Sequence, residues 1–268
     1  MSWTVMRASL QQRKTSLMWY SLGLAAYSWF IVWYYPQFAG NEEFFKQIEE
    51  LFTQEMLAAF GAADLNFATL GGFLGVEYLS LIWVVIVGAA VIAFAAKSIA
   101  SEVETGTMEL TLAQPVSRLS VATSRYLAMA IYAATLNLAT VVPIWVACEA
   151  YDVEIELKAL ALLLGMGLLV TLAIGGFAYA ASAFVTGGSK VGAASAGVLG
   201  AMWLANFISA MNESTEFLDN FTIFHYWKPG AIIDDAVTKP EAWWVFGVAT
   251  VLFAAIGIWQ FTRRDVAA

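Results

Sequence analysis

Six long apolar runs dominate this sequence and constrain its fold more than any other feature. They occupy residues 16–36, 77–96, 126–148, 159–186, 191–211 and 242–261. A helix rises about 1.5 Å per residue, so about 20 apolar residues suffice to cross about 30 Å of hydrocarbon. Unbroken runs also differ from the alternating pattern of barrel strands. The sequence therefore predicts an all-α polytopic membrane protein with six transmembrane helices.

The composition supports a membrane protein without a metal or cofactor site. Only 13% of the 268 residues are charged, against roughly a quarter in soluble domains, and the mean hydropathy is +0.71. The single cysteine, Cys148, excludes an internal disulfide, and the single histidine, His225, excludes a multi-histidine site. We expect one membrane domain over residues 1–268, beginning with an interfacial helix that leads into an uncleaved first span.

The basic residues predict the orientation of the spans. With both termini in the cytoplasm, nine Lys and Arg residues lie inside and four outside, in agreement with the positive-inside rule. The inside group comprises Arg7, Arg13, Lys14, Lys97, Arg118, Arg125, Lys190, Arg263 and Arg264, and the outside group Lys46, Lys158, Lys228 and Lys239. We therefore expect a multi-pass plasma-membrane protein with cytoplasmic termini.

The polar segment between the second and third runs, residues 97–125, is predicted to form two short helices. Gly106 permits a tight turn between them, and Thr107 is positioned to cap the second helix. Met108 and Leu110 are expected on one apolar surface of that helix, and Ser117 is expected to cap the third span. Periodicity alone fits an ordinary amphipathic loop as well as a docking element.

The order of residues in this segment resembles the ABC-2 family, the membrane-spanning permease subunits of ATP-binding-cassette exporters. The similar string reads Glu102-x-Glu104-x-Gly106-Thr107, then Leu110, then Pro115-Val116-Ser117-Arg118. The resemblance implies a half-transporter in which this loop is a coupling helix that contacts a nucleotide-binding subunit. The residues that it assigns to coupling are Glu102, Glu104, Gly106, Thr107, Glu109, Pro115 and Arg118.

The same resemblance implies partners for the chain. They are a separate P-loop ATPase that carries ATP and Mg, a second permease copy in a homodimer or with a related chain, and membrane lipid, with no nucleic acid. In agreement, the chain lacks a G-x-x-x-x-G-K-[ST] loop, so ATP hydrolysis would occur on another polypeptide and this chain would not be an enzyme.

The alternative is a stand-alone membrane carrier or scaffold that ATP does not drive. No charged residue lies in the middle of a predicted span, which disfavours ion-coupled transport. Within the spans, Asn137 and Asn206 are the most polar deep residues and either bond another helix or line a substrate path. Small residues at four-residue spacing, Gly192, Ala196 and Gly200, predict close helix packing within the chain or between two copies.

Two segments outside the membrane carry further predictions. Residues 41–61 have the apolar periodicity of an amphipathic helix, and residues 212–241 are expected to form a re-entrant or interfacial element between the last two spans.

Overall fold

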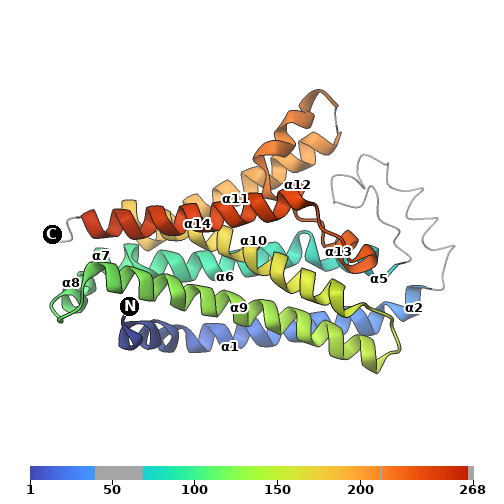
Figure 1. Cartoon of the computed structure of the whole chain (residues 1–268), viewed down its shortest axis with the longest axis horizontal. Helices are drawn as coiled ribbons and strands as arrows, with labels where there is room; N and C mark the ends of the chain where they lie inside the picture. The colour runs from blue at the N-terminus through green and yellow to red at the C-terminus, as the bar shows by residue number, and fades with distance from the viewer. Residues whose placement is uncertain (40–68, 212, 265–268) are drawn as a thin grey trace.

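The computed structural model describes residues 1–39, 69–211 and 213–264, so the amphipathic helix predicted at residues 41–61 lies outside the described part. All the regular elements in these ranges are helices. Long helices run along the molecule nearly parallel to one another, and short helices connect them at its two ends (Figure 1). This arrangement confirms the predicted all-α fold.

Five helices in the described part are long and apolar enough to cross a membrane. They correspond to the second to sixth predicted runs. The second helix begins at Ile82 rather than at residue 77, because residues 75–79 form a separate π-helix, and the fourth ends at Phe184 rather than at residue 186. The five helices are α6 (Ile82–Ser98), which continues through α7 (Ala100–Glu104), α9 (Arg118–Ala150), α10 (Leu157–Phe184), α11 (Gly188–Met211) and α14 (Pro240–Arg263).

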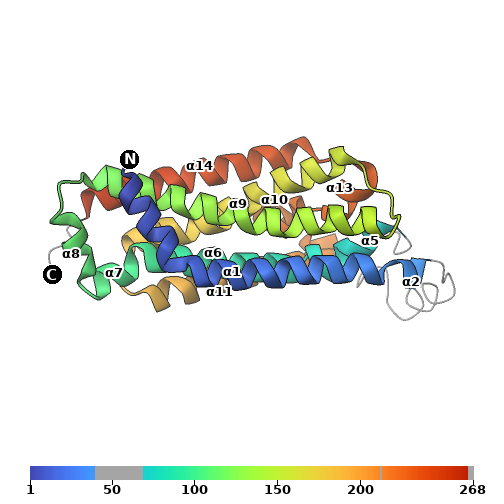
Figure 2. The same ribbon diagram turned by 90° about the horizontal axis from the view of Figure 1, so that it is seen from below.

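The first predicted run lies in α1 (Trp3–Tyr34), a single helix of 32 residues. It is about 48 Å long, enough to cross a bilayer, but its many Ser, Tyr and Trp residues lower its hydropathy below that of the five other helices. The residues of the predicted interfacial helix form the first turns of α1. These turns slant across one end of the bundle, whereas the rest of α1 runs beside α9 (Figure 2). A one-turn helix, α2 (Pro36–Ala39), follows.

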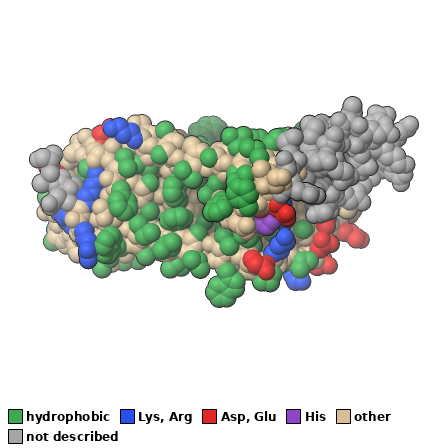
Figure 3. All heavy atoms as spheres, turned by 90° about the horizontal axis from the view of Figure 1, so that it is seen from above, with side chains coloured by type: hydrophobic (Ala, Val, Ile, Leu, Met, Phe, Trp, Pro, Cys, Tyr) green, Lys and Arg blue, Asp and Glu red, His purple; other side chains and the backbone are tan. Residues whose placement is uncertain are grey.

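The two ends of the bundle differ in charge. Both termini lie at the end that holds α7 and α8 (Thr107–Leu112), here called the terminal end (Figure 1). Lys and Arg side chains gather at the terminal end, and Asp and Glu side chains gather at the opposite end (Figure 3). A belt of hydrophobic side chains separates the two groups, as expected for a protein that spans a bilayer.

At the opposite end, short helices fold back against the long ones. They are α5 (Leu70–Leu74), the π-helical η1 (Gly75–Leu79), the 3-10 helix η2 (Glu213–Phe221), α12 (Ile223–Tyr226) and α13 (Pro229–Asp235). Trp227 is buried beside Trp83, with ring centroids 5.3 Å apart, and its Nε1 donates to the carbonyl of Leu79 at 2.8 Å. The predicted element between the last two spans is therefore a set of helices anchored in the bundle.

The long helices are buried to different degrees. Of the most apolar window of α6, 67% is buried, against 11% for α11 and 17% for α14. Glycines let the central helices approach closely, since a Cβ at Gly175 of α10 would press on Met129 and Val91. The core therefore lies among α6, α9 and α10, and α11 and α14 leave most of their surface uncovered.

Candidate functional site

The α7–α8 hairpin, residues 99–117, stands at the terminal end between α6 and α9 (Figures 1 and 2). It turns at Gly106, whose φ of 72° lies in the left-handed region that other residues rarely adopt. Gly106 is also the N-cap of α8, so Thr107 is already inside the helix, and the predicted Thr107 cap is wrong. The Thr107 hydroxyl instead lies 3.0 Å from that of Thr105.

The first brace of the hairpin joins it to α9. Glu102 Oε2 lies 2.5 Å from Arg125 Nη2, and Arg125 Nη1 donates to the carbonyl of Ser98. The Arg125 side chain is only 5% exposed, so this ion pair is shielded from water. Breaking a buried pair from one side costs about 3–5 kcal/mol, because the remaining charge stays buried. The pair therefore holds α7 firmly against α9.

A second brace joins the hairpin to α11. Glu104 Oε2 accepts a hydrogen bond from the backbone N–H of Gly188 at 3.2 Å, at the first residue of α11. A carboxylate is favoured there by the helix dipole. A Cβ at Gly188 would overlap the Ser101 hydroxyl, so only glycine allows α11 to approach α7 this closely. The hairpin is thus attached to two separate long helices.

Further contacts fix the two ends of α8. Met108, near its start, is fully buried in the core. After α8 the chain turns through Pro115, and Ser117 caps α9 by accepting from the Ser120 N–H at 3.2 Å, as predicted. Arg118 then donates to the carbonyl of Arg264, at the end of α14.

Arg264 itself caps the neighbouring helix α10. Its guanidinium donates to the carbonyls of Ser182 and Ala183, at 3.2 and 3.0 Å, and to the Thr186 hydroxyl at 2.6 Å. Desolvation lowers the pKa of Arg264 from its ordinary value, but an arginine remains protonated at neutral pH. The Arg118 contact therefore connects the start of α9 with the ends of α10 and α14.

The outer face of the hairpin is open to the surroundings. Leu110 is 72% exposed, although its neighbour two residues earlier, Met108, is fully buried. Most residues predicted for coupling are exposed as well. They are Glu104, Gly106, Thr107, Glu109 and Pro115. Leu110 is thus an apolar side chain on the open surface of the hairpin.

The sequence of the whole chain agrees with one family. Residues 5–266 match the sequence model of the ABC-2 family transporter proteins. The chain belongs to the ABC-2 transporter family. Members of this family are membrane permeases of ABC transporters rather than catalytic enzymes, so this chain is a multi-pass transport subunit. Comparison with curated proteins finds no match.

The structure separates the residues predicted for coupling into two groups. Glu102, Glu104 and Arg118 bond to other parts of the chain, whereas Glu109 and Pro115 are exposed and project from the hairpin. The partners of the first group, Arg125, Gly188 and Arg264, were not among the predicted site residues. The pairing of Glu104 with Gly188 joins positions 84 residues apart, and no local pattern marks such a contact.

The two asparagines proposed for the substrate path lie in different surroundings. Asn137 is 1% exposed, and its Nδ2 donates to Thr171 Oγ1 of α10 at 3.1 Å. It therefore bonds another helix, which was one of the two predicted possibilities. Asn206 lies half-buried on α11. The two residues thus do not form one polar site.

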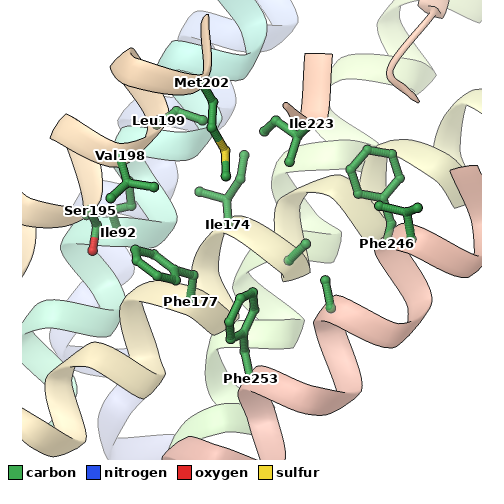
Figure 4. A pocket seen from close by; sticks show the side chains of 13 residues that line it. Ile92, Ile174, Phe177, Ser195, Val198, Leu199, Met202, Ile223, Phe246 and Phe253 are labelled. Atoms are coloured by element: carbon green, nitrogen blue, oxygen red, sulfur yellow. The ribbon is translucent and has the colours of Figure 1, made fainter. Parts of the chain in front are cut away.

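An apolar cavity lies among α6, α10, α11 and α14 (Figure 4). Its volume is about 140 Å³, and Ser195 is the only polar residue among those that line it. Phe177, Phe253 and Met202 surround its space in the close-up. An apolar cavity of about 150 Å³ can hold a benzene ring. The cavity is therefore suited to a small apolar group rather than a polar one.

Proposed function

We propose that this chain is the membrane-spanning subunit of an ATP-driven exporter. A separate P-loop ATPase, carrying ATP and Mg, binds the exposed face of the α7–α8 hairpin. The chain lies in the plasma membrane with both termini and the hairpin in the cytoplasm, in keeping with the basic residues at the terminal end.

The observation that carries this proposal is the two-sided construction of the hairpin. Its inner side is bonded to α9 through Arg125 and to α11 through Gly188, and its outer side presents Leu110. A force applied to the outer side therefore moves two long helices together with the hairpin. A loop without such braces would bend instead of transmitting the movement.

In this mechanism the coupling residues have different tasks. Leu110 and Glu109 contact the ATPase, Gly106 gives the hairpin its turn, and Glu102 and Glu104 position the hairpin on the spans. ATP binding and hydrolysis on the partner change the position of the hairpin. α6, α9 and α11 then shift relative to the rest of the bundle and open the path for the substrate.

The docking surface is tested with two matched leucines. Leu110 on the hairpin is 72% exposed, and Leu157, at the start of α10 at the opposite end, is 71% exposed. We expect Leu110→Glu to abolish co-purification of the ATPase in mild detergent and Leu157→Glu to leave it unchanged. Equal retention by the two variants would contradict docking at the hairpin.

The turn is tested with Gly106→Pro. Proline fixes φ near about −65°, whereas Gly106 has a φ of 72°, so the hairpin cannot keep its shape. We expect normal membrane insertion but no ATP-driven transport. Full transport by this variant would contradict the coupling role. A homomeric preparation without ATPase activity, from cells that express the candidate partner, would favour the stand-alone carrier or scaffold.

We further propose that a second permease copy packs on α11. A Cβ at Gly192, Gly197 or Gly200 would meet no neighbouring atom within 4 Å in the described part of the chain. Packing against the described residues therefore does not explain the small residues of this helix, and close contact with another helix does.

Cysteine cross-linking tests this contact in a Cys148→Ala background. We expect Ala196→Cys, on the exposed face of α11, to form a disulfide-linked dimer in membranes, and Val251→Cys, on the exposed face of α14, to form none. Cross-linking through Val251→Cys alone would place the dimer contact on α14 instead.

A further inference from the structure

A second, polar crevice opens at the terminal end, between the first turns of α1 and the α7–α8 hairpin. It encloses about 640 Å³, within the range of small-molecule sites. The first turns of α1 and the hairpin both line the crevice, and the N–H of Ser2 bonds the Ser124 hydroxyl of α9 at 2.7 Å. Residues of α1, α6, the α7–α8 hairpin and α9 thus form its walls.

The charge of the crevice is positive. Arg13, Lys97 and Arg125 line it, and Glu102 is the only carboxylate among its lining residues. Glu102 is already paired with Arg125. Among the described residues, neither Arg13 nor Lys97 has a carboxylate within 4.0 Å. Arg13 and Lys97 therefore form no salt bridge in the described part of the chain, and Glu102, the carboxylate that acts on Arg13, is already paired with Arg125.

The position of the crevice indicates the source of an anion. One to three turns after Arg13, α1 exposes Met18, Trp19 and Leu22, which are 49%, 66% and 54% exposed. Such side chains face lipid on a membrane-spanning helix, and tryptophan favours the interface with water. Arg13 and the crevice therefore lie at the level of the lipid headgroups, where basic pockets between helices bind anionic lipids.

We propose that this crevice binds the phosphate of an anionic phospholipid. Arg13 and Lys97 are its counter-ions. Thr105, Thr107 and Leu110 of the hairpin line the same crevice, so the bound lipid connects α1 with the hairpin. This inference goes beyond the proposed function, because lipid binding requires neither the ATPase nor ATP.

Native mass spectrometry of the purified full-length chain tests the proposal. Phosphatidylglycerol and phosphatidylcholine are added in turn, and the retained lipid is counted. We expect phosphatidylglycerol to be retained several-fold more than phosphatidylcholine, whose choline group cancels its phosphate charge. Equal retention of the two lipids would overturn the proposal.

Matched variants locate the lipid. We expect Arg13→Gln and Lys97→Gln, at an exposed position, each to weaken phosphatidylglycerol binding about fivefold, and the double variant about 25-fold. Arg7→Gln is the control, since Arg7 lies on the same helix but does not line the crevice. An equal loss in Arg7→Gln would mean attraction by the whole basic end rather than a site.

A competition experiment separates the lipid from free phosphate. Inorganic phosphate at millimolar concentration is added during the lipid measurement, and we expect the bound phosphatidylglycerol to be retained, because its glycerol and acyl chains also contact the protein. Complete displacement by inorganic phosphate, or its binding without any lipid binding, would overturn the assignment to a phospholipid.

Discussion

Arg125 of α9 and Glu102 of α7 form an ion pair, with 2.5 Å between Nη2 and Oε2, at the base of the α7–α8 hairpin. The side chains are 5% and 20% exposed. Arg125 Nη1 also bonds the Ser98 carbonyl, where α6 ends. One guanidinium therefore holds together the end of α6, the hairpin and α9, and the hairpin moves with these helices.

Removing the carboxylate of this pair should destabilise the protein. We expect Glu102→Gln to lower the free energy of unfolding by about 3 kcal/mol, because Arg125 remains buried without its counter-ion. Unfolding in mixed micelles by titration with a denaturing detergent measures the change. Glu109→Gln, on the exposed side of the same hairpin, is the control and should change the free energy by less than about 0.5 kcal/mol. Similar values for the two variants would mean that the ion pair does not stabilise the fold.

A side chain at Gly106 should destabilise the hairpin, because the backbone there is left-handed. We expect Gly106→Ala to destabilise the hairpin by about 1–2 kcal/mol, since alanine is strained at a φ of 72°. Gly23→Ala, inside α1 with open space around its Cα, should instead stabilise the helix by up to about 1 kcal/mol. Thermal unfolding of the two purified variants checks the opposite signs. A stabilising Gly106→Ala would contradict the turn described here.

The sequence predicted the long helices and one of the two helix caps, because both depend on residues that are close together in the chain. The apolar runs identified the long helices, because a bilayer requires apolar length regardless of which helices are neighbours. Ser117 caps α9 as predicted, since capping involves only the next three residues. Thr107 is not the cap of α8, because the helix begins one residue earlier than predicted. Gly106, with its positive φ, occupies the N-cap position, and Thr107 is the first residue of the helix.

The braces of the hairpin could not be predicted in the same way. Glu102 and Arg125 are 23 residues apart, and Glu104 and Gly188 are 84 apart, so only the packing of the helices brings them together. Met108 and Leu110 were expected on one surface. Residues two apart on a helix point in different directions, and the structure buries the first and exposes the second.

Asp234 should anchor the short helix α5 at the opposite end. Its carboxylate accepts from the N–H groups of Gly71 and Gly72, at 2.7 and 3.1 Å, and from the Thr69 hydroxyl at 2.6 Å. We expect Asp234→Ala to cost about 1–2 kcal/mol, the upper range for a lost helix cap. The neighbouring Asp235→Ala is the control and should have little effect. Hydrogen exchange of the α5 amides measures local opening, and equal protection in the two variants would exclude the capping role.

The Ser195 hydroxyl at the apolar cavity should reduce stability. It is buried, and its Oγ has no hydrogen-bond partner in the described part of the chain. We expect Ser195→Ala to raise the free energy of unfolding by about 1 kcal/mol, because it removes an unpaired polar group. Ser182→Ala is the matched control: that buried hydroxyl donates to the Tyr179 carbonyl at 2.7 Å, and its loss should destabilise the protein by a similar amount. Detergent titration of the two variants side by side checks the signs. If Ser195→Ala is destabilising as well, the Ser195 hydroxyl has a partner in solution and the cavity is not purely apolar.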